Sequence, residues 1–136
     1  MKIIVDTCIW SAALRRTKQV QSVAVEELRC LITDHRVQMI GPIRQEVLSG
    51  IRDASQFQRL SQHMESFPDL QILTEDYVMA AKYFNLCRGK GIQGSNKDFL
   101  ICAVAIHRKY AVFTTDGDFD MFAEHIPVVL HKTLKH

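Results

Sequence analysis

The sequence lacks several features that mark particular classes of protein. Its four cysteines form no Cys-x-x-Cys pair, so neither a disulfide framework nor a zinc site is indicated. No apolar run approaches the ~18 residues of a membrane span, and the apolar residues before the first acidic residue are too few for a signal-peptide core. We therefore expect a cytoplasmic protein without a membrane partner, whose reduced cysteines are buried as small apolar residues: Cys8, Cys30, Cys87 and Cys102.

The chain also lacks a large excess of charge of either sign. Its 17 Lys and Arg residues stand against 15 Asp and Glu, and a net charge of +2 is only a weak indication of a polyanionic partner. A length of 136 residues is typical of one domain and allows a sizeable core. Because no repeat or linker divides the sequence, we expect a single domain over residues 1–136.

Short strand patterns alternate with helical patterns along the chain. The strands expected from short apolar runs are 3–5, 37–40, 70–73, 112–113 and 128–130. The helices expected from spacings of three and four residues begin near Cys8 and cover 20–31, 42–49, 57–67, 78–84 and 99–106. The glycine-rich stretch 88–97 is expected to be the longest loop. This alternation predicts an α/β three-layer sandwich with a mostly parallel central sheet flanked by helices.

Four carboxylates occupy positions that such a fold could bring together. Asp6 ends the first strand and Asp116 follows a late one, and open parallel sheets bind ligands beyond the carboxyl ends of their strands. Asp98 begins the apolar helix, and Glu46 lies in the short helix 42–49. Each has a structural alternative as well. Asp6 and Asp98 could be helix caps, Asp116 part of a D-G-D turn and Glu46 a solvated side chain, and these alternatives stay open.

If the carboxylates converge, they require a positive charge. Carboxylates in one crevice repel one another and lose hydration, and a divalent cation relieves both effects. An all-oxygen set of donors favours Mg²⁺ or Mn²⁺ over zinc. No histidine is assigned as a ligand: His107 is expected to interact with the carboxyl end of its helix, and His131 and His136 to lie in the tail.

Four short motifs follow one another in a definite order. They are V-D-T at 5–7, a lone Glu46 in a short helix, D-x-L-I-x-A-x-A from Asp98 and T-x-D-x-D-F from Thr114. In this order they resemble the PIN-domain nucleases and, more narrowly, the VapC-type toxins of toxin–antitoxin pairs. The resemblance spans residues 3–129, although 52–83 carry no recognisable motif of the family.

The resemblance implies a PIN-like fold and a metal-dependent endoribonuclease that acts as a toxin. It implies that Asp6, Asp98 and Asp116 coordinate Mg²⁺ or Mn²⁺, and that Glu46 binds through water or orients the attacking water. Asp118 would be a fifth acidic member. It further implies a homodimer and an antitoxin whose segment covers the acidic crevice.

Other polar and aromatic residues are candidates for accessory roles. Thr7 and Thr114 would hold the carboxylates or a phosphate oxygen. The basic residues that could contact RNA phosphates, or be solvated surface charges, are Arg15, Arg16, Lys18, Arg88, Lys90 and Lys97. Lys97, directly before Asp98, would either lower the metal affinity or supply such a contact. Core packing is the expected role of Trp10, Phe119 and the stripe that begins at Phe57, with base stacking and an interface as the alternatives.

Other functions could use some of the same residues. A phosphatase with a D-x-D-x-T motif is not indicated because Cys8 stands at the second Asp position, and a receiver domain would need an acidic pair before the phosphoacceptor. A PIN-type nuclease that acts in RNA processing or on DNA remains open, as does a catalytically inactive domain that binds a partner. Charge does not separate RNA from DNA, because both attract basic residues through phosphate.

Overall fold

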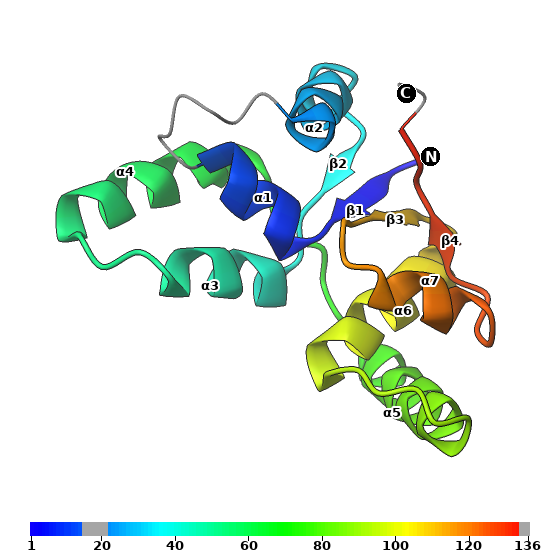
Figure 1. Ribbon diagram of the computed structural model, residues 1–136. Coiled ribbons are helices and arrows are strands. Elements are labelled where there is room, and N and C mark those ends of the chain that lie inside the picture. The colour runs from blue at the N-terminus through cyan, green and yellow to red at the C-terminus, as the bar shows by residue number, and fades with distance from the viewer. Residues whose placement is uncertain (15–21, 134–136) are drawn as a thin grey trace.

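The computed structural model describes residues 1–14 and 22–133, which are built around a sheet whose strands all pair in parallel. The strands are β1 (Ile3–Val5), β2 (Val37–Gln38), β3 (Ala111–Phe113) and β4 (Val129–Leu130). Their order across the sheet is β2-β1-β3-β4. Helices flank the sheet (Figure 1), so the α/β architecture expected from the sequence is confirmed.

The helices lie on both sides of the strands. In chain order they are α1 (Thr7–Leu14), α2 (Val23–Thr33), α3 (Gly41–Ser49), α4 (Ala54–His63), the 3-10 turn η1 (Met64–Ser66), α5 (Thr74–Gly89), α6 (Asn96–Arg108) and α7 (Asp118–Ala123). Figure 1 shows α1 to α4 gathered on one side and α5 and α6 on the other. Within the described ranges, no helix is both long and apolar enough to cross a bilayer.

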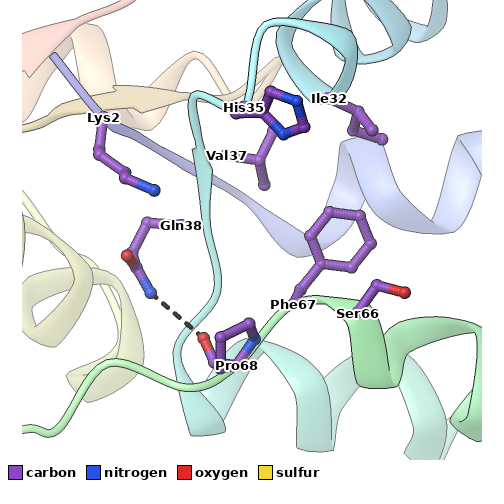
Figure 2. A pocket seen from close by; sticks show the side chains of 8 residues that line it. All are labelled: Lys2, Ile32, His35, Val37, Gln38, Ser66, Phe67 and Pro68. Carbon is purple, nitrogen blue, oxygen red and sulfur yellow. Dashed lines mark hydrogen bonds between the residues drawn. The ribbon is translucent and has the colours of Figure 1, made fainter.

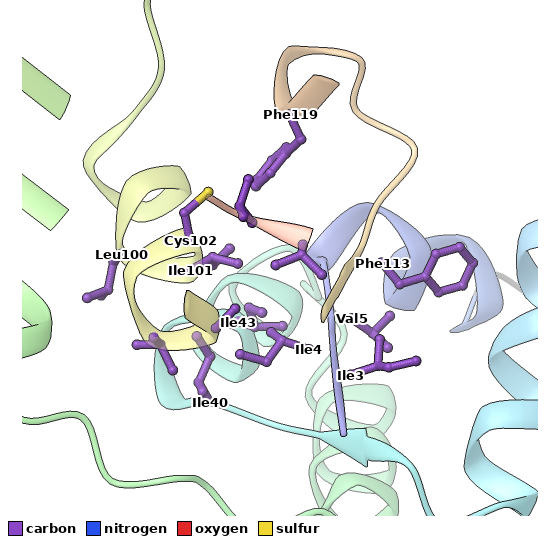
Figure 3. Close-up of a cluster of buried hydrophobic side chains, with 14 of the residues drawn as sticks. Ile3, Ile4, Val5, Ile40, Ile43, Leu100, Ile101, Cys102, Phe113 and Phe119 are labelled. Atoms are coloured by element: carbon purple, nitrogen blue, oxygen red, sulfur yellow. The ribbon is translucent and has the colours of Figure 1, made fainter. Parts of the chain in front are cut away.

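The central strands and α6 form the middle of one hydrophobic core. Every residue of β1 and β3 is buried, as β-branched and aromatic side chains of a parallel strand covered on both faces should be. α6 is buried over the whole run from Phe99 to Ala105. Figure 3 shows side chains of β1, α3 and α6 meeting in this core. The first turn of α6 is thereby fixed close to the sheet.

The order in which strands are added to the sheet reverses between β1 and β3. The chain goes from β1 to β2 on one side and later returns to β3 on the other side of β1. Val5 and Phe113 are partners at the ends of the two strands, so Asp6 and Thr114 follow at adjacent positions. Ligands of open α/β sheets bind at such a reversal, beyond the carboxyl ends of the strands.

Two expected strands differ from the structure. β2 ends at Gln38 because Ile40 already caps α3, which begins at the Gly-Pro pair. The strand expected over 70–73 is wrong. In the described chain, the only strand pairing next to this segment is a single bridge between Met39 and Asp69. Leu70 and Ile72 pack against the core, but the chain enters α5 at Thr74 before a ladder can extend.

The glycine-rich stretch is shorter than expected as a loop. α5 continues through Arg88 to Gly89, and α6 begins at Asn96, which leaves 90–95 as the connection. A basic residue in the last turn is favourable at the negative end of the helix dipole, which accounts for Arg88 being helical. The prediction of a loop over 88–97 is therefore wrong at both ends.

Some side chains lie in environments that the sequence did not predict. Cys87 and Cys102 are buried as expected, but Cys8 and Cys30 are exposed, so burial is wrong for these two residues. Phe57 is 41% exposed, so core packing is wrong for this residue.

Two histidines have definite partners. The expectation that His131 is a tail residue is wrong: its Nε2 lies 2.6 Å from Glu27 Oε2, and its ring meets Phe113 edge-on. His136 lies outside the described residues. His107 lies in the last turn of α6, as expected, and its Nδ1 is 3.0 Å from Asp76 Oδ1.

Asp76 joins α5 to α6 through a buried ion pair. Its carboxylate is fully buried and accepts hydrogen bonds from Arg108 Nη1 and Nη2, each at 3.0 Å, and from the Leu73 N–H at 2.8 Å. Burial alone would raise the pKa of Asp76, but the hydrogen bonds from Arg108, Leu73 and His107 outweigh it and lower the pKa from 3.8 to about 2. The pair therefore holds α6, and with it Asp98, against α5.

Asp76→Asn should destabilise the protein by about 2 kcal/mol at pH 7, because it leaves the partly buried Arg108 without its counter-charge. The folded pKa is below the unfolded one, so this stabilisation is complete above the unfolded pKa near 4 and disappears as the pH falls toward 2. Guanidinium unfolding at pH 7 and pH 3, with the exposed neighbour Glu75→Gln as control, measures it. An Asp76→Asn protein as stable as wild type at pH 7 would contradict the assignment.

Candidate active site

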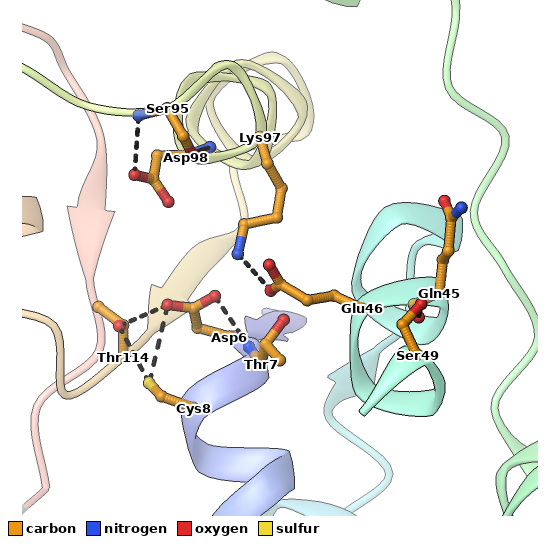
Figure 4. Close-up of polar contacts among 10 residues, drawn as sticks. All are labelled: Asp6, Thr7, Cys8, Gln45, Glu46, Ser49, Ser95, Lys97, Asp98 and Thr114. Carbon is orange, nitrogen blue, oxygen red and sulfur yellow. Dashed lines mark hydrogen bonds and ion pairs between the residues drawn. The ribbon is translucent and has the colours of Figure 1, made fainter. Parts of the chain in front are cut away.

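Asp6 presents a buried carboxylate at the carboxyl end of β1. The residue is only 4% exposed. Its Oδ1 accepts a hydrogen bond from the Thr7 N–H and its Oδ2 accepts one from Thr114 Oγ1, both at 2.8 Å (Figure 4). Its backbone carbonyl accepts the Ile9 N–H at 3.1 Å, so Asp6 also begins α1. The capping alternative and the position in a ligand crevice are thus compatible.

Thr114 connects Asp6 to the acidic turn after β3. Besides donating to Asp6, Thr114 Oγ1 accepts the Asp116 N–H at 3.0 Å. Asp116 Oδ1 in turn accepts the Asp118 N–H at 2.9 Å, at the start of α7. Both aspartates are exposed. The D-G-D segment therefore has the expected turn chemistry, and the backbone N–H of its first aspartate is linked to the Asp6 carboxylate through the Thr114 hydroxyl.

Asp98 forms the capping box that the sequence indicated. Its N–H donates to Ser95 Oγ and its Oδ2 accepts the Ser95 N–H, both at 3.1 Å. One carboxylate oxygen of Asp98 is thus used in starting α6. Burial, together with the negative charge of Asp6, raises the pKa of Asp98 despite the Ser95 hydrogen bonds and the positive charge of Lys97. The two carboxylates are therefore near enough to repel each other.

Glu46 on α3 forms an ion pair with Lys97 of α6. Figure 4 shows the lysine side chain crossing from α6 toward α3, next to Asp6. Burial alone would raise the pKa of Glu46, but Lys97 lowers it through a hydrogen bond and its charge. Burial alone would lower the pKa of Lys97, but Glu46, Asp6 and Asp98 together raise it. The ammonium group is accordingly part of the acidic cluster.

Thr7 has a buried hydroxyl group in the same acidic cluster. Its Oγ1 is buried and makes no hydrogen bond of ordinary geometry, although it is near enough to Glu46 to help lower the pKa of that carboxylate. A buried hydroxyl without a partner is rare, since it loses its hydration without compensation. Thr7 Oγ1 is therefore free to interact with a group that enters the site.

The donor set fits a hard cation, although its side chains are not arranged around one. Among residues 1–14 and 22–133, no three Asp, Glu, His or Cys side chains are close enough to form a ready metal site. The donors at hand are carboxylate and hydroxyl oxygens, which suit Mg²⁺ or Mn²⁺. Buried Asp6, partly buried Asp98 and the free Thr7 hydroxyl would all gain from a cation, provided that Glu46 turns away from Lys97.

The predicted phosphate-binding residues lie in different surroundings. Arg15, Arg16 and Lys18 fall outside the described residues. The Arg88 guanidinium lies 5.4 Å from the centroid of the Phe84 ring and donates to Asn85, and Lys90 is exposed. Of the three that the structure describes, Lys97 is the one paired with an acidic residue of the site.

Aromatic and sulfur side chains also bear on the site. Trp10 and Phe119 are buried at 3% and 0% exposure, so core packing is confirmed for both. Cys8, whose role the sequence did not suggest, has its Sγ 3.8 Å from Asp6 Oδ2 and accepts a hydrogen bond from Thr115 Oγ1 at 3.2 Å. The Glu46–Lys97 pair was also missed. Its one signal is a lysine in the first turn of a helix, where positive charge is unfavourable and an acidic partner is to be expected.

A hollow elsewhere on the surface does not compete as a reactive site. It lies beside β2, has a volume of about 350 Å³, and is lined by residues that include Lys2, His35, Gln38 and Phe67 (Figure 2). No carboxylate lines it, and Gln38 Nε2 already donates to the Pro68 carbonyl at 3.2 Å. The acidic cluster is the place where titratable groups with perturbed pKa values gather.

Known proteins share this sequence pattern and fold. Residues 3–124 match the sequence model of the PIN domain. VapC ribonuclease Mb1587 of Mycobacterium bovis and ribonuclease VapC11 of Mycobacterium tuberculosis are each 32% identical over 126 residues, which cover 89% of this chain and 91% of theirs.

Solved structures agree with the fold. The structure of FitAcB from Neisseria gonorrhoeae gives a TM-score of 0.75 at 20% identity and covers 95% of this chain and 96% of that one. VapBC2 from Rickettsia felis, bound to a DNA fragment from their promoter, gives a TM-score of 0.75 at 16% identity and covers 96% of this chain and 98% of that one.

Thr114→Val should lower the free energy of unfolding by about 1–2 kcal/mol, because it leaves buried Asp6 Oδ2 without its hydroxyl donor at nearly unchanged side-chain shape. Thr115→Val is the matched control, since Thr115 is exposed and its hydroxyl contacts only the Cys8 sulfur among its described neighbours. Urea unfolding of both variants measures the difference. Equal stabilities would show that the Thr114 hydroxyl does not support the carboxylate.

Proposed function

Because the chain belongs to the PIN-domain family and is related to VapC ribonucleases over most of its length, we propose that it is a VapC-type endoribonuclease toxin that depends on Mg²⁺ or Mn²⁺. The observation that carries this proposal is Asp6, a buried carboxylate held by two donors at the point between β1 and β3 where the strand order reverses. Asp98, near enough for the two charges to interact, completes the centre of the site.

The residues divide the proposed chemistry among them. Asp6, Asp98 and Asp116 would hold the cation, with Asp118 as an accessory carboxylate. When bound, the cation would polarise the scissile phosphate and promote loss of a proton from the attacking water. Glu46, whose pKa is held below its usual value, stays ionised at neutral pH and can accept a hydrogen bond that orients this water. Thr114 keeps Asp6 in place.

The RNA itself would be bound by basic residues around the acidic crevice. Carboxylates repel phosphate, so the predicted contacts at Arg15, Arg16, Arg88, Lys90 and Lys97 would provide the attraction. An enzyme with this substrate would act in the cytoplasm, where cellular RNA is translated.

A cognate antitoxin is the proposed protein partner. α4 has no buried residue, and exposed Phe57 lines a hollow together with Ile51 and Ala54. Ile51 also lines a neighbouring hollow that contains Glu46 and Leu14. A partly apolar antitoxin segment lying along α4 would therefore reach the acidic cluster and cover it, as the PIN toxin hypothesis requires.

We also propose a homodimer, with the outer face of α5 as the contact. This helix exposes three large apolar side chains that the core leaves uncovered, Tyr77 (55% exposed), Val78 (51%) and Leu86 (44%). Burying such a patch against a second copy would remove it from water.

Asp6→Asn and Asp98→Asn should each reduce RNA cleavage more than 100-fold, since each removes a negative charge that the cation requires. Asp120→Asn is the control, because Asp120 is an exposed aspartate paired with Lys132. The test has two parts: growth of bacteria that express each protein, with sequencing of RNA 5′ ends, and cleavage of the same RNA by purified protein with Mg²⁺, Mn²⁺ or EDTA. Full cleavage by a folded Asp6→Asn protein, or in EDTA, would refute the metal-dependent assignment.

Phe57→Asp should weaken antitoxin binding at least tenfold and leave RNA cleavage within about twofold of wild type, because it replaces an apolar contact of the hollow with a charge, away from the acidic cluster. Ser55→Asp, at an exposed residue of the same helix that lines neither hollow, is the control for added charge. Calorimetric titration with the cognate antitoxin measures the first effect. Unchanged affinity would place the antitoxin on another surface.

A further inference from the structure

Lys97 occupies a position where a lysine needs an explanation. It lies in the first turn of α6, where the helix dipole disfavours a cation. Its side chain is nevertheless only 27% exposed and turns inward to Glu46 of α3, 51 residues away in the sequence (Figure 4). A solvated surface lysine would point outward instead, so the inward orientation indicates an attraction to the acidic cluster.

The surroundings of the ammonium group account for that attraction. Three carboxylates act on it: Glu46 through the ion pair, and Asp6 and Asp98 through their charges. The basic residues at the end of α5 and in the following connection differ in this respect, since Arg88 packs on Phe84 and Lys90 is exposed. The cluster already contains one positive charge supplied by the chain itself.

We propose that Lys97 is the resident counter-ion of the acidic site, which engages Glu46 while the site lacks a metal and must give way when a divalent cation binds. This inference rests on the proposed function in one respect, namely that the carboxylates bind a cation at all. What it adds is that Lys97 sets the affinity of the site for that cation.

Charge competition is the physical basis of this role. An ammonium group and a divalent cation among the same carboxylates repel each other, and Glu46 cannot serve both without turning. The flexible four-carbon stem of lysine allows its ammonium group to swing toward solvent, which limits the penalty. Because the pair is partly exposed, solvent screens it, and removal of the charge should tighten metal binding about tenfold rather than by many orders of magnitude.

The experiment is a titration of purified protein with Mn²⁺, in which electron paramagnetic resonance measures the free ion. Lys97→Met should bind Mn²⁺ about tenfold more tightly than wild type. Lys90→Met removes an exposed lysine from the preceding connection and should change the affinity less than twofold. Lys97→Arg keeps the charge and should stay close to wild type, which separates charge from side-chain shape. Thermal melts establish that each variant is folded, and Lys97→Gln replaces the Met variant if that one is not.

Asp6→Asn makes the outcomes distinguishable. If Asp6→Asn weakens Mn²⁺ binding but Lys97→Met does not tighten it, the counter-ion inference is overturned and the proposed metal site stands. If Lys97→Arg binds as tightly as Lys97→Met, charge is not the cause and the inference also fails. If neither wild type nor Lys97→Met binds Mn²⁺, both this inference and the metal dependence of the proposed function fail. The inference is supported if Lys97→Met binds Mn²⁺ more tightly than wild type while Lys97→Arg and Lys90→Met do not.

Discussion

A carboxylate buried at the end of the central strand is the constraint on which the rest of the structure depends. Asp6 is almost fully buried, and a charge in that position is tolerated only if hydrogen-bond donors meet it. One donor comes from the start of α1 and the other from the residue after β3. The first helix must therefore begin directly at the strand end, and β3 must lie beside β1. The strand order and the position of α1 together provide the hydrogen-bond donors that the buried Asp6 carboxylate requires.

The features predictable from the sequence are those with a local cause. The β-branched run in β1 and the continuous apolar stretch in α6 indicated buried elements, and both are buried. The Ser95–Asp98 capping box follows from two residues three apart. The positions of Asp6 and Asp116 after strands were likewise local, and the rule that ligands bind beyond strand ends placed them on one edge. The acidic residues were therefore found without knowledge of their contacts.

The features that escaped prediction depend on contacts between distant segments. Lys97 meets Glu46 only because α3 and α6 face each other across the end of β1, and no pattern within either helix contains that fact. The apolar run at 70–73 indicated a strand, but only Leu70 and Ile72 are partly buried, and strand pairing there depends on how soon the chain enters α5. His131 was assigned to a tail because its partners, Glu27 and Phe113, belong to remote elements. The exposure of Cys8 likewise depends on how distant segments of the chain are arranged around α1.

The double use of the Thr114 hydroxyl couples the mechanics of the sheet to the acidic site. One oxygen donates to Asp6 and accepts from the backbone of Asp116, so it fixes both acidic segments to the same point. Sliding β1 past β3 by one residue would move that point by about 3.3 Å, more than the length of either hydrogen bond. The alignment of β1 with β3 therefore fixes the geometry of the acidic site. Changes elsewhere in the core, even far from any reacting group, are tolerated only as long as they leave these two strands in step.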